Sequence, residues 1–311
     1  MISSELFKQI LVKLVAYFRK ERGDFVSYRD LDYWQKNGFS ITPNHYYSPI
    51  PDLASLTPNV FTRESELLGI KIQVGKQALF LKKLAKYTKE LKNFTYISRG
   101  IDGQKDPKFY FGNLAFDNLD AYIYYSLVRF LKPKLVLEVG SGWSTKIAAH
   151  AARKNKNTRL VAIEPYPQPI LKKGFPGLYQ LIEKKIEDVP LSYFSRLKEN
   201  DILFIDSSHT VKTAGDVNYL FLEILPRLGK GVWVHIHDIF LPWEYPEKWV
   251  KREYRFWNEQ YLVHAFLLFN DHFEIVLANN FLAHKETHLI RSLFPVLKEV
   301  GGGSLWIRKI K

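Results

Sequence analysis

Four ionisable side chains stand directly after two apolar segments of this chain, and their types could carry chemistry. One apolar segment, 202–205, ends in Asp206 and His209, and a later one ends in His237 and Asp238. If both segments are neighbouring strands of a parallel sheet, they lie about 4.8 Å apart and the four groups meet at its carboxyl edge. Such a cluster is strained unless a proton, a metal ion or a substrate binds there. The pattern therefore predicts a proton-transfer or metal site.

A glycine turn follows another apolar segment earlier in the chain. Residues 135–139 are apolar except for Glu138, and Gly140-Ser141-Gly142 separates them from a helical pattern that begins near Ser144. Strand, glycine turn and helix start form the arrangement that holds a nucleotide-like ligand at a sheet edge. The next apolar segment ends at Glu164, about 20 residues on, where a ribose-binding carboxylate is expected.

Glu138-x-Gly140-x-Gly142 resembles the first motif of the class I S-adenosylmethionine-dependent methyltransferases, with Glu164 as the acid of the second strand. The likeness covers roughly residues 115 to 311. It implies S-adenosylmethionine as cofactor, and it implies that Glu187, after the third strand, lies where the family contacts the adenine ring. The residues that this resemblance assigns to the cofactor are Glu138, Gly140, Ser141, Gly142, Glu164, Glu187 and Asp206. From the residues alone, an ordinary nucleotide-binding βαβ unit is the alternative.

Asp206-x-x-His209 and His237-Asp238 resemble a methyltransferase subfamily that also contains cephalosporin-hydroxylase-like proteins. In those relatives and in catechol-type O-methyltransferases, acids at these strand ends hold a divalent cation that acidifies a substrate hydroxyl. The likeness implies a metal on Asp206, His209, His237 and Asp238, either Mg²⁺ or, because of the nitrogen ligands, Mn²⁺, Fe²⁺ or Zn²⁺. Without a metal, His209 or His237 would act as general base. The expected catalytic residues are His209, His237 and Asp206.

Alternating strand and helix patterns predict the fold. Strands are expected at 135–139, 159–163, 180–185, 202–206, 231–236, 272–277 and 304–309, and helices at 144–154, 168–173, 192–198, 213–226, 246–269 and 284–299. This alternation predicts an α/β, Rossmann-like, seven-stranded and mostly parallel sheet with helices on both faces. The family resemblance implies an antiparallel hairpin for the last two strands.

Two domains are expected, with the boundary near residue 112. Residues 1–112 form a helical extension that includes a strap at 37–61, rich in proline and aromatic residues, and residues 113–311 form the cofactor-binding domain. We interpret the strap as a lid or substrate-recognition segment, with a purely structural strap as the alternative. The side chains that we expect to contact substrate are His45 and Tyr47 in the strap, and Trp243 and Tyr245 after the fifth strand.

Composition restricts the location and the partners. The 311 residues include no cysteine, so disulfides and thiolate chemistry are excluded, and 45 basic against 32 acidic residues give a net charge of +13. This charge favours an anionic acceptor. Nothing resembles a signal peptide or a membrane-spanning segment, so a cytoplasmic protein is expected. The apolar positions of a helix over 3–20 predict packing on the body or on a second subunit, which makes a homo-oligomer an expectation.

The function predicted from these features is methyl transfer from S-adenosylmethionine to a small-molecule or natural-product acceptor, by O-methylation with metal assistance. One alternative is a metal-dependent oxygenase on the same fold, with Asp206, His209 and His237 as a two-histidine, one-carboxylate set. The other is a nucleic-acid-directed methyltransferase that uses the basic residues around Lys82 and Lys86. No arginine-rich arm or zinc finger supports a nucleic-acid partner.

Overall fold

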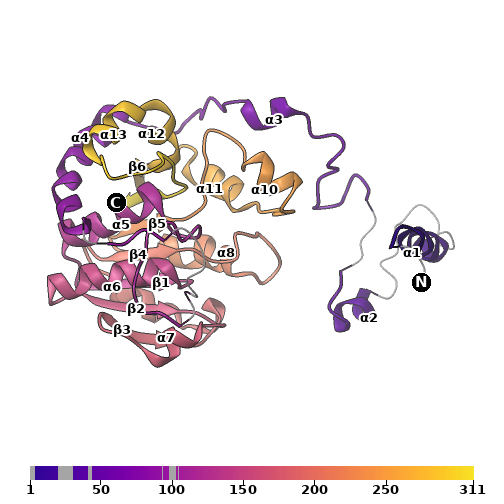
Figure 1. Cartoon of the computed structure of the whole chain (residues 1–311), viewed down its shortest axis with the longest axis horizontal. Helices are drawn as coiled ribbons and strands as arrows, with labels where there is room; N and C mark the ends of the chain where they lie inside the picture. The colour runs from indigo at the N-terminus through magenta and orange to yellow at the C-terminus, as the bar shows by residue number, and fades with distance from the viewer. Residues whose placement is uncertain (1–3, 20–30, 41–43, 93, 98–102, 104) are drawn as a thin grey trace. The chain divides into compact units, whose positions relative to one another are not determined.

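The computed structural model describes residues 4–19, 31–40, 44–92, 94–97, 103 and 105–311. The chain divides into two compact units, Met1–Thr57 and Pro58–Lys311. The smaller unit contains helices α1 (Ser4–Arg19) and α2 (Leu31–Lys36). The larger unit contains every strand described below and the residues expected to bind the cofactor (Figure 1). None of the helices in the described part of the chain is long and apolar enough to cross a membrane.

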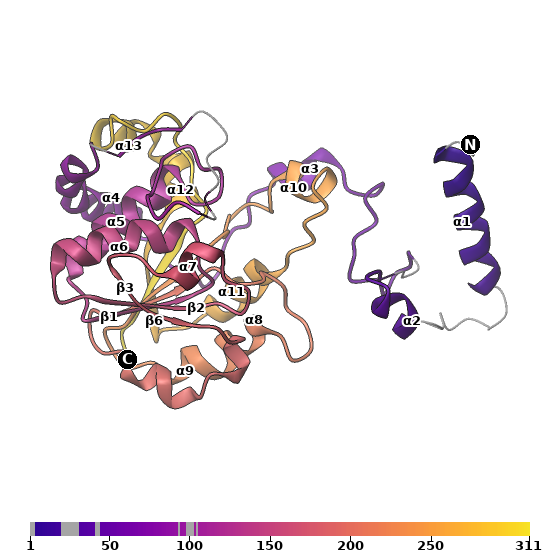
Figure 2. The same cartoon turned by 60° about the horizontal axis from the view of Figure 1, so that its bottom comes forward.

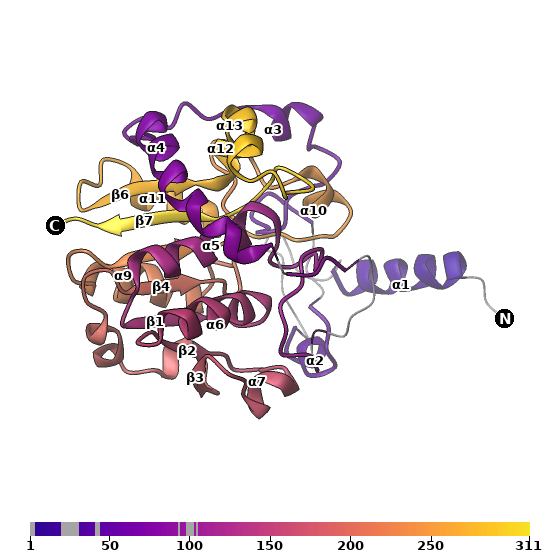
Figure 3. The same cartoon turned by 60° about the vertical axis from the view of Figure 1, so that its left-hand side comes forward.

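One seven-stranded sheet forms the centre of the larger unit, in the order β3-β2-β1-β4-β5-β7-β6. Strands β1 to β5 pair in parallel, whereas β7 is antiparallel to both β5 and β6 (Figure 3). This mixed, mostly parallel sheet confirms the predicted fold class. The strands are β1 (Leu135–Val139), β2 (Arg159–Ile163), β3 (Leu178–Ile182), β4 (Ile202–Ile205), β5 (Trp233–Ile236), β6 (Phe273–Ala278) and β7 (Leu305–Lys309).

Helices cover both faces of this sheet, as Figure 2 shows with α5 and α6 on one side and α9 on the other. The first face packs against α4 (Val74–Leu84), η1 (Ala85–Leu91), α5 (Asn118–Leu131), α6 (Trp143–Asn155), α7 (Pro169–Lys173), α12 (Asn279–Lys285) and α13 (Thr287–Leu293). The second face packs against η2 (Ile186–Asp188), η3 (Leu191–Arg196), α8 (Asp216–Asn218), the π-helical η4 (Tyr219–Ile224), α9 (Leu225–Arg227) and α11 (Glu259–Leu267). Two shorter helices complete the unit, α3 (Pro58–Thr62) and α10 (Glu247–Lys251).

The central strands are apolar on both sides because both faces are covered. In β1, Val136 belongs to the core of the first face, whereas Leu137 and Val139 belong to the core of the second. Alternation therefore directs Glu138 into the first face, toward α5. All five residues of β1 are buried. This explains why a parallel central strand reads as a nearly continuous apolar segment.

The compact unit begins at Pro58, well before the boundary expected near residue 112. Leu81 and Leu84 of α4 and Phe111 are fully buried in the core of the first face, together with α5. The side chain of Gln77 also accepts a hydrogen bond from the amide of Ala278 at 2.9 Å. These residues therefore belong to the sheet unit. Helical periodicity shows that a helix has an apolar face, but not which partner covers it.

Three predicted elements differ most from the structure. In the range 284–299, expected as one helix, α12 ends at Lys285 and α13 spans only Thr287–Leu293. The helix expected over 246–269 is two helices, α10 and α11, with residues 252–258 between them. The third strand ends at Ile182, so the expected residues 183–185 lie beyond it. The interruption after α10 matters most for function, because it places Trp257 and Asn258 in a loop and Glu259 at the first turn of α11.

Candidate functional site

The glycine turn after β1 (residues 140–142) and the loop that begins at Asp206 after β4 meet at the point where the strand order reverses, between β1 and β4. Ligands of open α/β sheets bind at such a point. The amide of Asp206 donates to the carbonyl of Val139 at 2.9 Å. Gly140 has a φ of +84°, and a Cβ added there would lie 1.7 Å from the carbonyl oxygen of Asp206. Only glycine therefore permits these two loops to approach so closely.

The glycine turn forms an open cradle at the start of α6. A Cβ added to Gly142 would meet no atom within 4 Å. The hydroxyl of Ser141 is buried and has no hydrogen-bond partner among the described residues. The carboxylate of Glu164 accepts from the amides of Ser141, at 3.2 Å, and Tyr166, at 2.8 Å. The turn thus offers space, an unpartnered hydroxyl and a fixed carboxylate, which fits a polar cofactor.

Glu138 is fully buried beneath this turn. One of its carboxylate oxygens accepts from the hydroxyl of Tyr124 at 2.9 Å. The hydroxyls of Thr145 and Ser144 lie close enough to lower the pKa of the carboxyl, but its second oxygen makes no hydrogen bond of normal geometry with a described residue. Burial, with a smaller contribution from the charge of Asp206, raises the pKa of Glu138 to about 8. An acid in this state favours a ligand that brings a positive charge or a hydrogen-bond donor.

The carboxyl ends of β4 and β5 bring together three of the four ionisable residues named from the sequence. We call this region the acceptor side, after the role expected for it. One ligand atom each of Asp206, His209 and Asp238 lies within 4.8 Å of the others. Nε2 of His209 is 3.2 Å from Asp206 Oδ1 and 3.7 Å from Asp238 Oδ2. His237 lies beside this group, with its Nε2 3.6 Å from Asp238 Oδ1 and its Nδ1 3.5 Å from the hydroxyl of Ser304. Two carboxylates and one imidazole therefore face a common space.

Burial and mutual charge set the protonation of this group. Burial disfavours charge on Asp206, but the neighbouring His237 and His209 outweigh it and hold the pKa of Asp206 well below its usual range. Burial likewise opposes a proton on His209, yet Asp206 and Glu259 raise the pKa of His209 well above its usual value. Burial raises the pKa of Asp238. The group thus holds an extra proton on His209 that a cation could replace.

Glu259 completes the acceptor side and was not identified from the sequence. Its Oε2 is 2.9 Å from Nδ1 of His209, and the residue is fully buried at the start of α11. The ring of Trp257 packs on His209 with centroids 4.3 Å apart. The only signal in the sequence was an acid within an aromatic-rich segment, and the expected continuous helix concealed it.

The remaining candidates occupy different surroundings. His235 is a core residue, with Nε2 2.7 Å from the Ser304 hydroxyl. Trp243 packs on His284 with ring centroids 4.3 Å apart. Tyr245 is buried, and its hydroxyl accepts from the amide of Gln260 at 3.0 Å. Glu187 lies in η2, after β3.

His45 and Tyr47 belong to the smaller unit. The amide of Tyr47 donates to Nδ1 of His45 at 3.0 Å, and the side chain of Tyr47 is 84% exposed within the described structure. His45 lines a hollow of that unit, together with residues 44, 46, 48 and 50–52, whereas Tyr47 is not part of its lining. Their contact with substrate stays a prediction.

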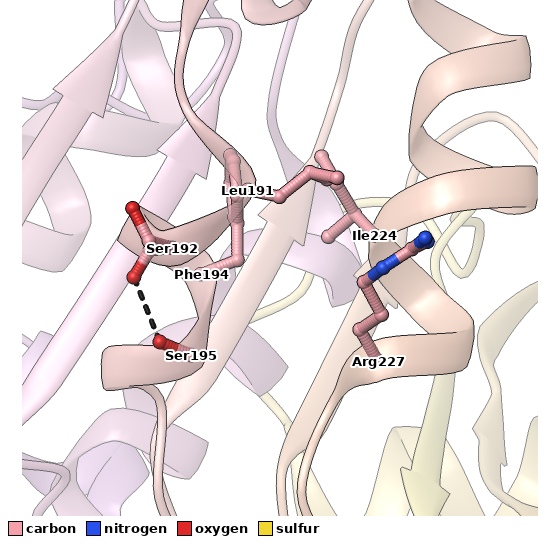
Figure 4. A pocket seen from close by; sticks show the side chains of 6 residues that line it. All are labelled: Leu191, Ser192, Phe194, Ser195, Ile224 and Arg227. Atoms are coloured by element: carbon pink, nitrogen blue, oxygen red, sulfur yellow. Dashed lines mark hydrogen bonds between the residues drawn. The ribbon is translucent and has the colours of Figure 1, made fainter.

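A hollow of about 200 Å³ lies between η3 on one side and η4 and α9 on the other, and none of the residues named as candidates lines it (Figure 4). Its wall is mostly apolar and includes Phe194 and Ile224. Two of its polar side chains are engaged within the protein, since Ser195 donates to the carbonyl of Ser192 and Arg227 pairs with Glu223 at 2.7 Å. This hollow therefore offers little to recognise a polar ligand.

Comparison with known proteins decides the family. The family model for a methyltransferase domain matches residues 137–239, which span the glycine turn, Glu164, Asp206, His209 and Asp238. The chain contains a methyltransferase domain, as the glycine-turn motif implies. An uncharacterized protein of Archaeoglobus fulgidus is 32% identical to this methyltransferase over 53% of this chain and 77% of that protein.

The solved structures to which this methyltransferase is similar include two O-methyltransferases. The O-methyltransferase TomG from Streptomyces achromogenes, solved with SAM, is 13% identical, with a TM-score of 0.40 over 80% of this chain and 92% of that chain. An O-methyltransferase from Bacillus cereus, solved with SAH, is 10% identical, with a TM-score of 0.38 over 77% of this chain and 93% of that one. The likeness to cephalosporin-hydroxylase-like proteins stays a prediction.

Proposed function

We propose that this methyltransferase transfers the methyl group of S-adenosylmethionine to a hydroxyl of a small, anionic acceptor, with the help of a divalent cation. The observation that carries the proposal is the compact group of a buried His209 with the partly exposed carboxylates of Asp206 and Asp238, directly against the glycine turn. Carboxylates and an imidazole are suited to bind and deprotonate a hydroxyl. The net charge of +13 supports an anionic acceptor.

The cofactor half follows from the cradle above α6. S-adenosylmethionine, when bound, supplies a methyl group that its sulfonium already activates. Glu138 offers its second buried oxygen to the cationic part of such a ligand. Glu164, held by two backbone amides, offers its remaining lone pairs to ribose hydroxyls. The protein's contribution to the reaction is then mainly alignment of donor and acceptor.

The acceptor half fits a divalent cation by its donor set. Asp206, His209 and Asp238 can each direct one ligand atom to a common point. A cation bound there would acidify an acceptor hydroxyl. The mixed oxygen and nitrogen ligands favour Mn²⁺ or Fe²⁺ over Mg²⁺. Nε2 of His209 would be the ligand atom, because Nδ1 faces Glu259. Without a bound cation, the same Nε2 would instead take up the acceptor proton.

The oxygenase alternative required Asp206, His209 and His237 as ligands. The compact group found in the described part of the chain instead contains one histidine and two carboxylates. His237 is not part of that group, and its ring nitrogens face Asp238 and Ser304. The arrangement therefore supports methyl transfer better than an iron oxygenase with two histidine ligands.

Calorimetric titration tests the proposal. We expect the wild-type chain to bind S-adenosylmethionine with micromolar affinity and Glu164→Ala to lose at least about tenfold, because the fixed carboxylate is gone. Glu183→Ala is the matched control, since this exposed acid pairs with Lys172 on the surface at 2.7 Å. Failure of the wild type to bind S-adenosylmethionine or S-adenosylhomocysteine would refute the proposal.

Titration of Mn²⁺ tests the metal separately. We expect Mn²⁺ to bind to the wild type and to be lost in Asp238→Asn, which removes a charged ligand. Cofactor affinity should change little in that variant. Methyl transfer to a panel of hydroxyl-bearing carboxylic acids and phosphate esters, measured with and without EDTA, would then identify the acceptor class. Transfer that is equally fast with EDTA would remove the cation from the proposal and leave His209 as the base.

A further inference from the structure

We propose that Glu259 is a positioning residue for His209, which holds Nδ1 so that Nε2 faces Asp206 and Asp238. The inference deepens the proposed function and rests on it. Oε2 of Glu259 is 2.9 Å from Nδ1, and Nε2, on the opposite side of the ring, is 3.2 Å from Asp206 and 3.7 Å from Asp238. An imidazole held in this way presents one defined nitrogen to the acceptor side.

The backbone around Glu259 also holds the His209 loop. The amides of Asn258 and Glu259 both donate to the carbonyl of His209, each at 3.1 Å. The amide of Val211 donates to the side chain of Asn258 at 2.5 Å, and Trp257 covers the imidazole. His209 has a φ of +55°, which a residue other than glycine keeps only where its surroundings enforce it. Three successive residues, 257 to 259, supply that enforcement.

The next residue ties the same segment to the loop after β5. The side chain of Gln260 accepts from the amide of Phe240 at 3.0 Å and donates to the carbonyl of Trp243 at 3.1 Å. The loop after β4, with His209, and the loop after β5, which continues from Asp238, are therefore both anchored on the start of α11. This segment organises the acceptor side in the way that the glycine turn organises the cofactor side.

A role in packing alone does not explain why position 259 is a glutamate. Glu259 is fully buried, and its Oε1 has no hydrogen-bond partner among the described residues. A buried carboxylate with an unsatisfied oxygen is costly, and an amide or an apolar side chain fills such a position more cheaply. A carboxylate on the remote nitrogen of a histidine is the usual way to fix the orientation of a ligand or base.

The first test uses Mn²⁺ alone as the probe, measured by the loss of its free electron paramagnetic resonance signal. Glu259→Leu should weaken Mn²⁺ binding by about 10–100-fold, the range for partners that orient metal ligands. Glu259→Gln, which keeps an acceptor for Nδ1–H, should restore most of the affinity. S-adenosylmethionine should bind all three proteins equally. Parallel loss of cofactor and Mn²⁺ binding in Glu259→Leu would reduce Glu259 to a structural role and overturn the proposal.

The second test does not depend on a metal. Nitrogen-15 spectra of the histidine side chains, assigned with His209→Asn, should show a slowly exchanging Nδ1 proton on His209 in the wild type and in Glu259→Gln. This signal should disappear in Glu259→Leu; if it persists there, the proposal is wrong. Wild-type protein that binds S-adenosylmethionine but no Mn²⁺ would contradict the proposed metal, while the spectra still decide the role of Glu259. If Glu259→Leu does not fold, Glu259→Asp takes its place, because it withdraws the oxygen but keeps the charge.

Discussion

Replacing Glu138 with glutamine should stabilise the protein, and the gain should grow with pH. The carboxyl is fully buried, and its pKa of about 8 lies far above the ordinary value of 4.5. Between these two values the folded chain keeps a proton that the unfolded chain releases. The contribution of Glu138 to the free energy of unfolding is therefore most favourable below pH 4.5. It falls as the pH rises through 8, the pKa in the folded chain. Glutamine keeps the shape and the oxygen that accepts from Tyr124, but it has no charge to bury.

The size of the effect follows from the two pKa values. At pH 7 the glutamate costs about 3 kcal/mol relative to a neutral side chain of the same shape, and above pH 9 the cost approaches about 5 kcal/mol. For a unit of this size, about 3 kcal/mol corresponds to a rise of roughly 6–12 °C in melting temperature. The difference between Glu138→Gln and wild type should be small at pH 5.

Thermal unfolding followed by circular dichroism at pH 5, 7 and 8.5, without cofactor, measures this difference. Tyr124→Phe is the matched control, because it removes the hydrogen bond to Glu138 but leaves the carboxyl. It should lower stability at each pH. A constant difference between Glu138→Gln and wild type across these three pH values would refute the reasoning about burial.

Three further outcomes are expected. S-adenosylmethionine carries positive charge, so its binding beside Glu138 should lower the pKa of the carboxyl and release close to one proton at pH 7. Calorimetry in buffers of different ionisation enthalpy measures this release, which should vanish in Glu138→Gln. Gly140→Ala should destabilise the chain by about 3 kcal/mol or more in denaturant titrations, because the new Cβ would lie 1.7 Å from the carbonyl of Asp206. Gly142→Ala should leave stability unchanged but weaken cofactor binding about tenfold or more, because its Cβ enters open space in the cradle; equal stability losses in the two glycine variants would contradict this distinction.

The cofactor half of the site could be predicted because its signals are local. Glu138, Gly140 and Gly142 lie within one strand and one turn, and the strand–glycine–helix pattern restricts their arrangement. Glu164 follows the next strand, which pairs with β1 in register. Short apolar segments that alternate with helical patterns also made the sheet predictable, because this alternation is typical of a parallel sheet covered on both faces.

The acceptor half was predictable only in part. Asp206, His209 and Asp238 follow neighbouring strands, so their meeting could be inferred from the strand order. Glu259 reaches His209 only because the chain breaks between α10 and α11 and returns to the site, and no sequence period encodes that return. The sequence did not predict that α4 packs on the sheet. An amphipathic pattern shows that a helix has an apolar face, but it does not show which element covers that face.

The contact between Gly140 and the carbonyl of Asp206 has a consequence for how new acceptor preferences arise. It fixes the spacing between the methyl-donor turn and the acid loop through main-chain atoms, so side-chain substitutions elsewhere do not alter it. Residues 239–256, which follow Asp238 and precede Trp257, lie outside that contact and are rich in aromatic side chains. Loops on such a fixed frame tolerate change well. Acceptor choice in this family can therefore diverge within that segment while donor alignment is inherited intact.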